Sequence, residues 1–263
     1  SRGTTCAPRD HSMTHVDATI QARTGSSRLP GKVLRDVDGK PLLQRQIERI
    51  QRSERIDRII IATSNGAQDD ALEALAEKMG IGCFRGSEDD VIGRVCGALR
   101  AFDVEVHAEF MGDNSIPDPR VIDHVIDTFF ELGDSVDYVT NALKTTYPPG
   151  LEVSVYRAST LFDAESKTVE GDIREYCGFH IYTHPERYRV VNLEAPDHHH
   201  RPHLHLEVDT EEDFQVVAAV YRHFGDSMFS LDDVVSFADA NPSLFESNSR
   251  VERRWKQYRQ DED

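Results

Sequence analysis

The hydrophobic positions between residues 16 and 132 follow two alternating periods. Short apolar runs that are typical of buried strands occur at 16–22, 58–63, 81–85 and 104–111. Between them, apolar residues recur every three or four positions, as on one helix face, in segments that begin at Pro41, Asp69, Ser87 and Pro119. Ser87 is predicted to cap its helix and Gly80 to end the preceding one. This alternation predicts an α/β fold, a mostly parallel sheet with helices on both faces.

The pattern changes after residue 134. Strand-like pieces that are shorter and less regular follow at 138–141, 151–156, 188–193 and 203–208. They predict a small mixed β extension of the sheet. Helical periodicity returns at 211–224, 231–240 and 244–254, which predicts C-terminal helices.

Composition narrows the class of protein. The 263 residues are 38% hydrophobic and carry a formal net charge of −17. No apolar run is long enough for a membrane span, and the polar first twelve residues lack the apolar core of a secretory signal. The scattered cysteines contain no CxxC pair, so we expect a reduced, cytoplasmic, soluble protein. The acidic charge argues against nucleic acid as a partner.

Against this acidic background, three cations are concentrated in residues 21–34, QARTGSSRLPGKVL. Arg23, Arg28 and Lys32 alternate there with small residues, which allow backbone N–H groups to approach an anion closely. The segment therefore predicts a phosphate-binding loop. It differs from the common ATPase loop because Val33, rather than Ser or Thr, follows the lysine. The alternative interpretation is a basic surface turn.

A polar loop follows each of the first four predicted strands. Ligands of open α/β sheets bind beyond the carboxyl ends of the strands, so these loops are expected to form one site. After the basic loop, they are Thr63-Ser64, Arg85-Gly86-Ser87 and Gly112-Asp113.

Two aspartates stand out as candidate metal ligands. Asp113 follows the fourth strand, and Asp209 follows the predicted strand 203–208. Two carboxylates beside a polyphosphate suit Mg²⁺, which would bring them within roughly 4 to 6 Å of each other. We expect both to face Arg23 and Lys32 across a cleft. The alternatives are a turn cap at Asp113 and a helix N-cap at Asp209.

The loop at 21–34 resembles the N-terminal signature of cytidylyltransferases that make CMP-activated sugar acids, in particular the spore-coat-polysaccharide type. Further motifs of this family follow in order, over roughly residues 16 to 250, at 62–65, 85–91, 112–114, 148–153, 174–175 and 208–210. The resemblance implies a three-layer fold of the nucleotide-diphospho-sugar transferase type and a homodimer. It also implies a leader at 1–14, a nucleotidyltransferase domain at 15–225 whose segment 135–205 binds the acceptor and dimerises, and a helical appendage at 226–263.

The resemblance assigns roles to individual residues. It implies that Mg²⁺ binds Asp113 and Asp209, and that these act in catalysis with Arg23 and Lys32. The implied nucleotide-binding residues are Ala22, Arg23, Thr24, Gly25, Ser26, Arg28, Lys32, Thr63, Ser64, Arg85, Gly86, Ser87 and Gly112. The implied acceptor-binding residues are Asn141, Tyr147, Glu152, Arg174, Glu175 and His205. His205 and Glu207 stand where the family more often has arginine and threonine, which leaves the identity of the acceptor open.

The implied activity is transfer of CMP from CTP to an acidic acceptor, with release of pyrophosphate. A sugar acid for surface polysaccharide is the first expectation for the acceptor, and a phosphonate or phosphate monoester is the alternative. A catalytically silent nucleotide-binding or metal-binding protein is the alternative of another class. The histidines at 198–205 suggest zinc, although their spacing argues against a preformed site; His203 and His205 would share one face of a strand.

Overall fold

A computed structural model of the chain describes residues 14–169 and 172–258. Residues 1–13 of the predicted leader lie outside the described residues. No helix within the described ranges has the length and apolar character needed to cross a membrane.

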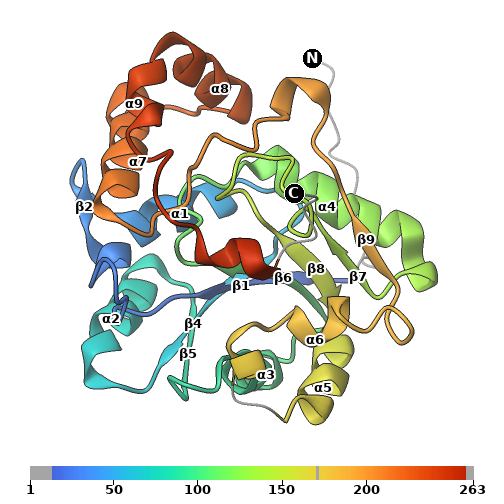
Figure 1. The fold of residues 1–263 in the computed structure, drawn as a ribbon. Coiled ribbons are helices and arrows are strands. Elements are labelled where there is room, and N and C mark those ends of the chain that lie inside the picture. Colours follow the sequence, from blue (N-terminus) through green and yellow to red (C-terminus); the bar gives the residue numbers. More distant parts are fainter. Residues whose placement is uncertain (1–13, 170–171, 259–263) are drawn as a thin grey trace, which may run out of the picture.

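A seven-stranded sheet forms the centre of the molecule (Figure 1). Its strands lie in the order β5-β4-β1-β6-β8-β7-β9. The strand bounds are β1 (Val16–Gln21), β4 (Arg58–Ser64), β5 (Gly82–Gly86), β6 (Val106–Met111), β7 (Tyr138–Thr140), β8 (Ser154–Arg157) and β9 (Val190–Asn192). Only β8 runs antiparallel to its neighbours in this sheet. The predicted mixed β extension thus continues the main sheet, while β2 (Asp36–Val37) and β3 (Lys40–Pro41) form a separate hairpin.

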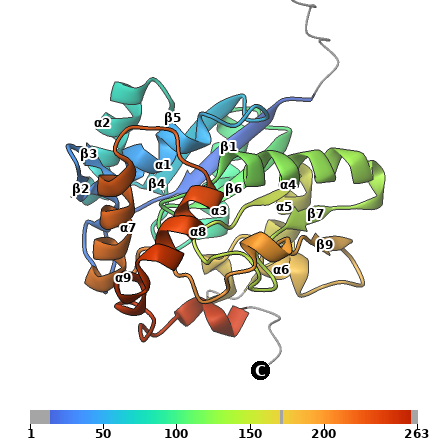
Figure 2. The same cartoon turned by 90° about the horizontal axis from the view of Figure 1, so that it is seen from above.

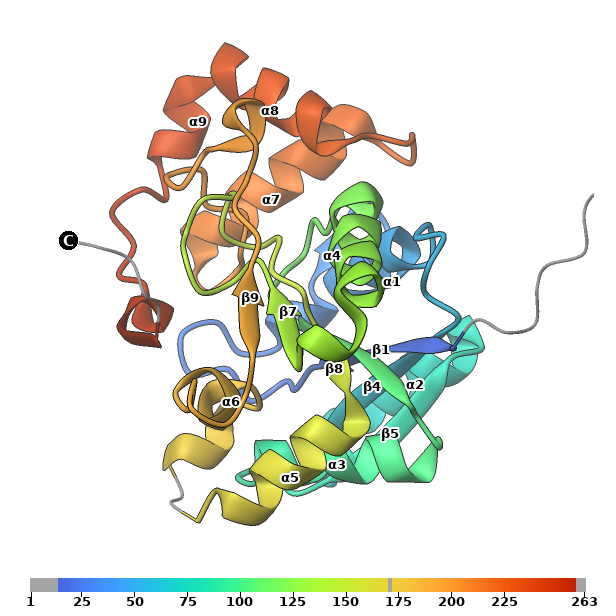
Figure 3. The same ribbon diagram turned by 90° about the vertical axis from the view of Figure 1, so that its right-hand side faces the viewer.

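Helices cover both faces of the sheet, which confirms the predicted three-layer α/β fold (Figures 1 and 3). The apolar residues of α1 (Leu42–Ile50), α2 (Asp70–Met79) and α4 (Pro119–Leu132) share one core with one face of the sheet. Those of α3 (Val91–Ala101), α5 (Ala158–Lys167) and α6 (Phe179–Tyr182) share a second core with the other face. Burial of these two apolar layers is the main force that holds the sheet and helices together.

The last three helices form a group beyond the sheet (Figure 2). They are α7 (Glu211–Phe224), α8 (Leu231–Ala240) and α9 (Pro242–Glu246), and they share a third apolar cluster with residues of α1 and α4. The chain then returns from α9 toward the middle of the sheet (Figure 1). This return places residues 252–255 near the carboxyl ends of the parallel strands, as the contacts described below show.

The predicted strand at 203–208 is wrong. Apart from one isolated bridge between Asn114 and Glu207, this segment has no ladder partner in the part of the chain that the structure describes. Its backbone instead bonds to loops: the Leu206 N–H donates to the carbonyl of Pro149, and the Val208 N–H to that of Asp113. The loop at Gly150 approaches so closely that a Cβ there would lie 2.5 Å from the Glu207 nitrogen. The alternating apolar pattern therefore reflects burial in a loop-lined groove, which sequence periodicity alone does not distinguish from a strand.

Two helix boundaries also differ from the predictions. The helix expected at 244–254 stops at Glu246, because Asn248 and Arg253 turn inward and are buried. The cap of α3 is Asp90, whose carboxylate accepts a hydrogen bond from the Gly93 N–H, rather than Ser87. Ser87 instead accepts a hydrogen bond from the Asp90 N–H, so it supports the true cap.

Candidate active site

The loops after β1 and β6 meet at the carboxyl edge of the sheet. The Gly112 N–H donates to the carbonyl of Gln21 at 2.8 Å. A Cβ at position 112 would lie only 2.9 Å from that oxygen, so only glycine permits this approach. Two loops whose contacting residues are 91 positions apart in the sequence are thereby placed side by side.

The basic loop is held in place by a buried carboxylate. The backbone and hydroxyl of Thr24 both donate to Asp69, at 2.8 and 2.6 Å, and the Gly31 N–H closes the loop on the Thr24 carbonyl. Burial opposes ionisation of Asp69, but hydrogen bonds from Ser64 and Thr24 lower its pKa overall. Thr24 and Ser64, both predicted to bind nucleotide, thus fix the shape of the loop that would receive it.

Lys32 lies between the two predicted metal ligands. Its ammonium is 3.3 Å from a carboxylate oxygen of Asp113 and 2.9 Å from one of Asp209. The structure therefore brings the two aspartates together at the sheet edge. Lys32 sits in a short 3₁₀ helix and is 8% exposed, so it stands between the carboxylates instead of facing them across a cleft.

The charges in this cluster are strongly coupled. Burial raises the pKa of Asp113, Lys32 opposes this shift, and the charge on Asp209 adds to it. Burial alone would lower the pKa of Lys32, but the two carboxylates raise it overall. Arg28 adds a second cation, 2.5 Å from Asp209.

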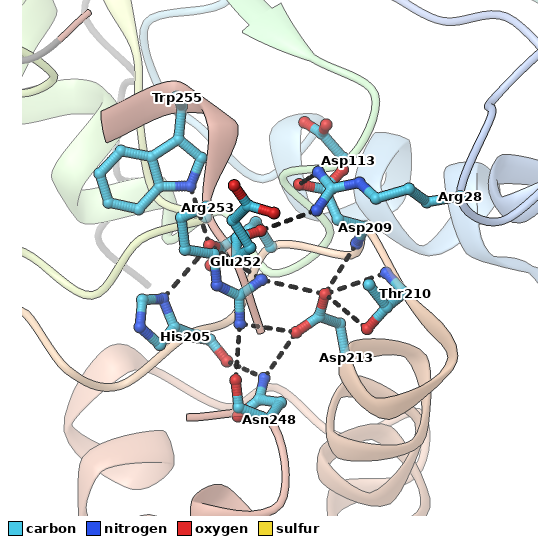
Figure 4. A network of polar contacts seen from close by, with 12 residues as sticks. Arg28, Asp113, His205, Asp209, Thr210, Asp213, Asn248, Glu252, Arg253 and Trp255 are labelled. Carbon is cyan, nitrogen blue, oxygen red and sulfur yellow. Dashed lines mark hydrogen bonds and ion pairs between the residues drawn. The ribbon is translucent and has the colours of Figure 1, made fainter. Parts of the chain in front are cut away.

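Asp209 is not the N-cap of α7, so that alternative is wrong. The helix is capped by Thr210. The backbone N–H groups of Asp209 and Thr210 both donate to the carboxylate of Asp213, at 3.0 Å each. This arrangement leaves the side chain of Asp209 free to contact Lys32. Figure 4 shows it directed at Arg28.

The C-terminal segment reaches the same place. Arg253 forms a bidentate, buried ion pair with Asp213, at 2.8 and 3.0 Å. Arg28 donates to the backbone carbonyl of Glu252 at 2.8 Å. Figure 4 shows the resulting network, which links the C-terminal segment through Asp213 to the backbone of Asp209.

Two cavities of similar size, about 270 and 290 Å³, adjoin at Asp113 and Asp209, which line both. The first is lined by basic side chains: Arg23, Arg28, Lys32, Arg94 and Arg254. The second is lined by carboxylates and aromatic rings: Glu109, Glu152, Glu175, Glu207, Tyr138, Tyr176, Phe179, Tyr182 and Trp255. The first is thus suited to an anion such as a polyphosphate, and the aspartates lie where the contents of the two cavities would meet.

The predicted nucleotide-binding residues divide between the first cavity and its surroundings. Those that line it are Ala22, Arg23, Gly25, Ser26, Arg28, Lys32 and Gly112. Those that do not are Thr24, Thr63, Ser64, Arg85, Gly86 and Ser87. Arg85 is turned toward α2, where it pairs with Asp70 and Glu73 at 2.7 and 2.8 Å.

Only two of the predicted acceptor-binding residues, Glu152 and Glu175, line the second cavity. The other four predicted residues contact other parts of the protein. Asn141 holds the backbone of Leu151 and Val153, and Tyr147 is buried against His199. Arg174 pairs with Asp90, the cap of α3. His205 is buried behind Glu207, at 3.2 Å from its carboxylate.

The histidine-rich segment forms a different cluster from the one expected. His203 and His205 are not on a strand, and His203 is exposed while His205 is buried. Instead His198, His199 and Asp232 have possible ligand atoms that all lie within 4.8 Å of one another. Asp232 already pairs with His199 and with Arg120, which accounts for the cluster without a metal.

Sequence reasoning missed several cavity residues. Glu109 on β6 and Arg94 on α3 are charged residues within largely apolar stretches. The sequence could therefore have marked both as candidate site residues. Arg254 and Trp255 gave no such signal, because their position depends on the return of the chain after α9.

Comparison with known proteins identifies the class of enzyme. The sequence profile of the cytidylyltransferase family matches residues 18–247, so the chain belongs to this family of nucleotidyltransferases. It is 35% identical to the spore coat polysaccharide biosynthesis protein SpsF of Bacillus subtilis, over 88% of this chain and 96% of that protein.

Solved structures share the fold. A cytidylyltransferase from Leptospira borgpetersenii matches with a TM-score of 0.85 and 26% identity, over 92% of this chain and 100% of that one. A CMP:2-keto-3-deoxy-manno-octonic acid synthetase complexed with CTP matches with a TM-score of 0.60 and 17% identity, over 80% and 99%. The similarity to this synthetase shows only that the two proteins share a fold.

Proposed function

We propose that this protein transfers CMP from CTP to a small acidic acceptor, a sugar acid for surface polysaccharide, and releases pyrophosphate. The observation that carries the proposal is the junction of a basic cavity with a second cavity at Asp113 and Asp209. The names of the related proteins support cytidine as the base and a polysaccharide precursor as the product. We further propose that the enzyme is a cytoplasmic homodimer.

The reaction needs positioned reactants and charge neutralisation more than covalent chemistry. An acceptor oxygen attacks the α-phosphorus of CTP, a new P–O bond forms, and the bond to the bridging oxygen of the β-phosphate breaks. Arg23, Arg28 and Lys32 line the cavity in which we place the triphosphate, so they would neutralise the charge that develops on the departing pyrophosphate.

The aspartate pair fits a divalent cation. Both ligands are hard carboxylate oxygens, and the charge of Asp209 acts on the half-buried Asp113. Asp113 and Asp209 would hold Mg²⁺, which would supply positive charge to the phosphate oxygens when bound. Lys32 and Arg28, which contact these carboxylates, would orient them toward the nucleotide.

Pyrophosphate release tests this function directly. The purified protein is supplied with Mg²⁺, one of CTP, ATP, GTP or UTP, and a panel of sugar acids, phosphonates and phosphate monoesters. We expect pyrophosphate from CTP with a sugar acid. Equal or faster turnover of ATP would contradict the cytidine assignment, and tight CTP binding without pyrophosphate from any acceptor would indicate a silent nucleotide-binding protein.

Substitutions at the aspartates test the mechanism in the same assay. Asp113→Asn and Asp209→Asn should each abolish Mg²⁺-dependent turnover, and the double variant should be scarcely worse, because residues that serve one metal fail as a unit. Asp239→Asn, at an exposed position on α8, is the matched control. Additive losses from the two single substitutions would contradict a shared metal.

A further inference from the structure

The second cavity contains a carboxylate for which the proposed reaction has no use. Glu109 lies on β6, four residues before Asp113, and lines the second cavity but not the first. Asp113 and Asp209, at which the transfer would occur, line both cavities, so Glu109 belongs to the part of the second cavity that the first does not share.

Glu109 is held by neutral groups. The amide of Gln21 donates to one of its carboxylate oxygens and the hydroxyl of Tyr156 to the other. Within residues 14–169 and 172–258, no lysine, arginine or histidine forms an ion pair with it. Because a buried charge is costly unless it is paired, burial raises the pKa of Glu109.

The rest of the cavity is also poor in cations. Of the described residues that line it, only Arg28 and Arg254 are basic. Both also line the first cavity, so they lie at the junction, and Arg28 is already bound to Asp209. Glu207 also lines the cavity; its Oε1 atom is 3.3 Å from the guanidinium of Arg253, and its Oε2 atom is buried without a hydrogen-bond partner among the described residues.

Aromatic rings complete the surroundings. Tyr138, which lines the cavity, stacks on Tyr156 at a centroid distance of 5.1 Å, and Tyr156 in turn bonds to Glu109. Phe179, Tyr182 and Trp255 line the same cavity. A carboxylate beside aromatic rings is a setting that binds an ammonium ion, through charge and through cation–π attraction. The same setting disfavours a second acidic group at this end of an acceptor.

On the basis of the proposed function, we infer that the acceptor carries a primary amino group and that its ammonium form pairs with Glu109. The acidic group of the acceptor would lie at the other end of the cavity, near Arg28 and Arg254.

Matched acceptor pairs test this inference. One pair is a 3-deoxy-octulosonic acid and its analogue with an amino group in place of the terminal hydroxyl; the other is 2-hydroxyethylphosphonate and 2-aminoethylphosphonate. Calorimetry with the full chain, Mg²⁺ and a non-hydrolysable CTP analogue gives the affinity for each compound. We expect the amino compound to bind at least tenfold more tightly than its hydroxyl partner in at least one of the two pairs.

Substitution of the carboxylate gives the second measurement. In Glu109→Gln, the ratio of the two affinities should fall to about one, whereas in Glu105→Gln, an exposed position just before β6, it should stay unchanged. A general loss of stability would weaken both members of a pair together and would leave their ratio intact.

The outcomes separate the inference from the proposed function. An amino compound that binds through Glu109 without release of pyrophosphate from CTP would refute the cytidylyltransferase function but not the amine site. Pyrophosphate release with no preference for the amino compound, or a preference that survives Glu109→Gln, would overturn the amine site alone. Absence of binding by every compound would overturn it as well.

Discussion

At the scale of single residues, two basic side chains compensate the negative charges of Asp113 and Asp209. Lys32 contacts both carboxylates, and Arg28 contacts one of them. Lys32 is buried, so its ammonium lost most of its contact with water when the chain folded. Such a group is costly to bury alone and stabilises the fold only through its partners.

Lys32→Ala is therefore expected to affect both stability and turnover. Removal of Lys32 leaves Asp113 without a cation and Asp209 with Arg28 alone, so unfolding in urea without metal should require on the order of 3 kcal/mol less free energy. Millimolar Mg²⁺ should restore part of this loss, because it replaces the missing positive charge. Pyrophosphate release should fall by at least a hundredfold, on the order of the loss of one oxyanion-hole donor.

Lys40→Ala provides the comparison for Lys32. Lys40 pairs with Glu48 and Asp226 on the surface of the protein, where ion pairs contribute little. Unchanged stability of Lys32→Ala in the absence of metal would contradict the tight cluster seen in the structure.

At the scale of elements, the start of α7 is joined to the end of the chain. Asp213, in the first turn of α7, binds the backbone of Asp209 and Thr210 on one side and the guanidinium of Arg253 on the other. Burial would raise the pKa of Asp213, but the hydrogen bonds and the charge of Arg253 lower it overall. The orientation of Asp209 thus rests on a pair in which neither side chain is more than 1% exposed.

Arg253→Met should break this pair with little change in volume. It leaves Asp213 as an unpaired buried carboxylate, so the free energy of unfolding should fall by about 3 to 5 kcal/mol. Because Asp213 also fixes the backbone of Asp209, the Mg²⁺ concentration for half-maximal turnover should rise.

The control for this substitution is Arg250→Met, at an exposed position of the same segment. Stability is read from urea denaturation, and metal dependence from pyrophosphate release at increasing Mg²⁺. A fully folded Arg253→Met protein with an unchanged Mg²⁺ requirement would show that Asp209 is positioned by other groups.

At the scale of the whole molecule, the two cavities are enclosed by segments from both ends of the sequence. The basic loop after β1 lines the first cavity, and residues 254–255 close the second. Trp255 is held there by a hydrogen bond of 3.0 Å from its indole nitrogen to Glu207. The C-terminal segment therefore forms part of the wall that a bound acceptor would touch.

A chain that ends at Arg253 should fold but bind its acceptor poorly. The Arg253–Asp213 pair remains, so the melting temperature should change little, whereas loss of Trp255 and Arg254 opens the second cavity. The KM for the acceptor should rise more than tenfold. CTP at a hundred times its Kd should still stabilise the truncated protein by about 2.7 kcal/mol, measured from its melting temperature.

Removal of residues 259–263 alone is the control, because it leaves both side chains in place. An acceptor KM that is equal in the two truncated proteins would exclude a role for Arg254 and Trp255 in acceptor binding.

The sequence by itself determined the elements and the edge of the sheet where the site lies. The periodicity of β1, β4, β6 and α4 is strong and local, so their positions could be predicted closely. The rule that ligands bind at the carboxyl ends of parallel strands then placed the basic loop next to Asp113. The family motifs extended this placement to Asp209, which lies 96 residues further along the chain.

Only the tertiary structure decided which side chains line the cavities. His205, Tyr147 and Arg174 were predicted to bind the acceptor, but each has another role. His205 pairs with Glu207, Tyr147 is buried in the core, and Arg174 pairs with Asp90, which is distant in the chain. Lys32 lies between two carboxylates from separate segments, and Trp255 reaches the site only because the chain turns back after α9. Local patterns record which face of an element is buried, because that depends on near neighbours along the chain. Contacts between segments a hundred or more residues apart depend on how the layers pack, and no local pattern carries that information.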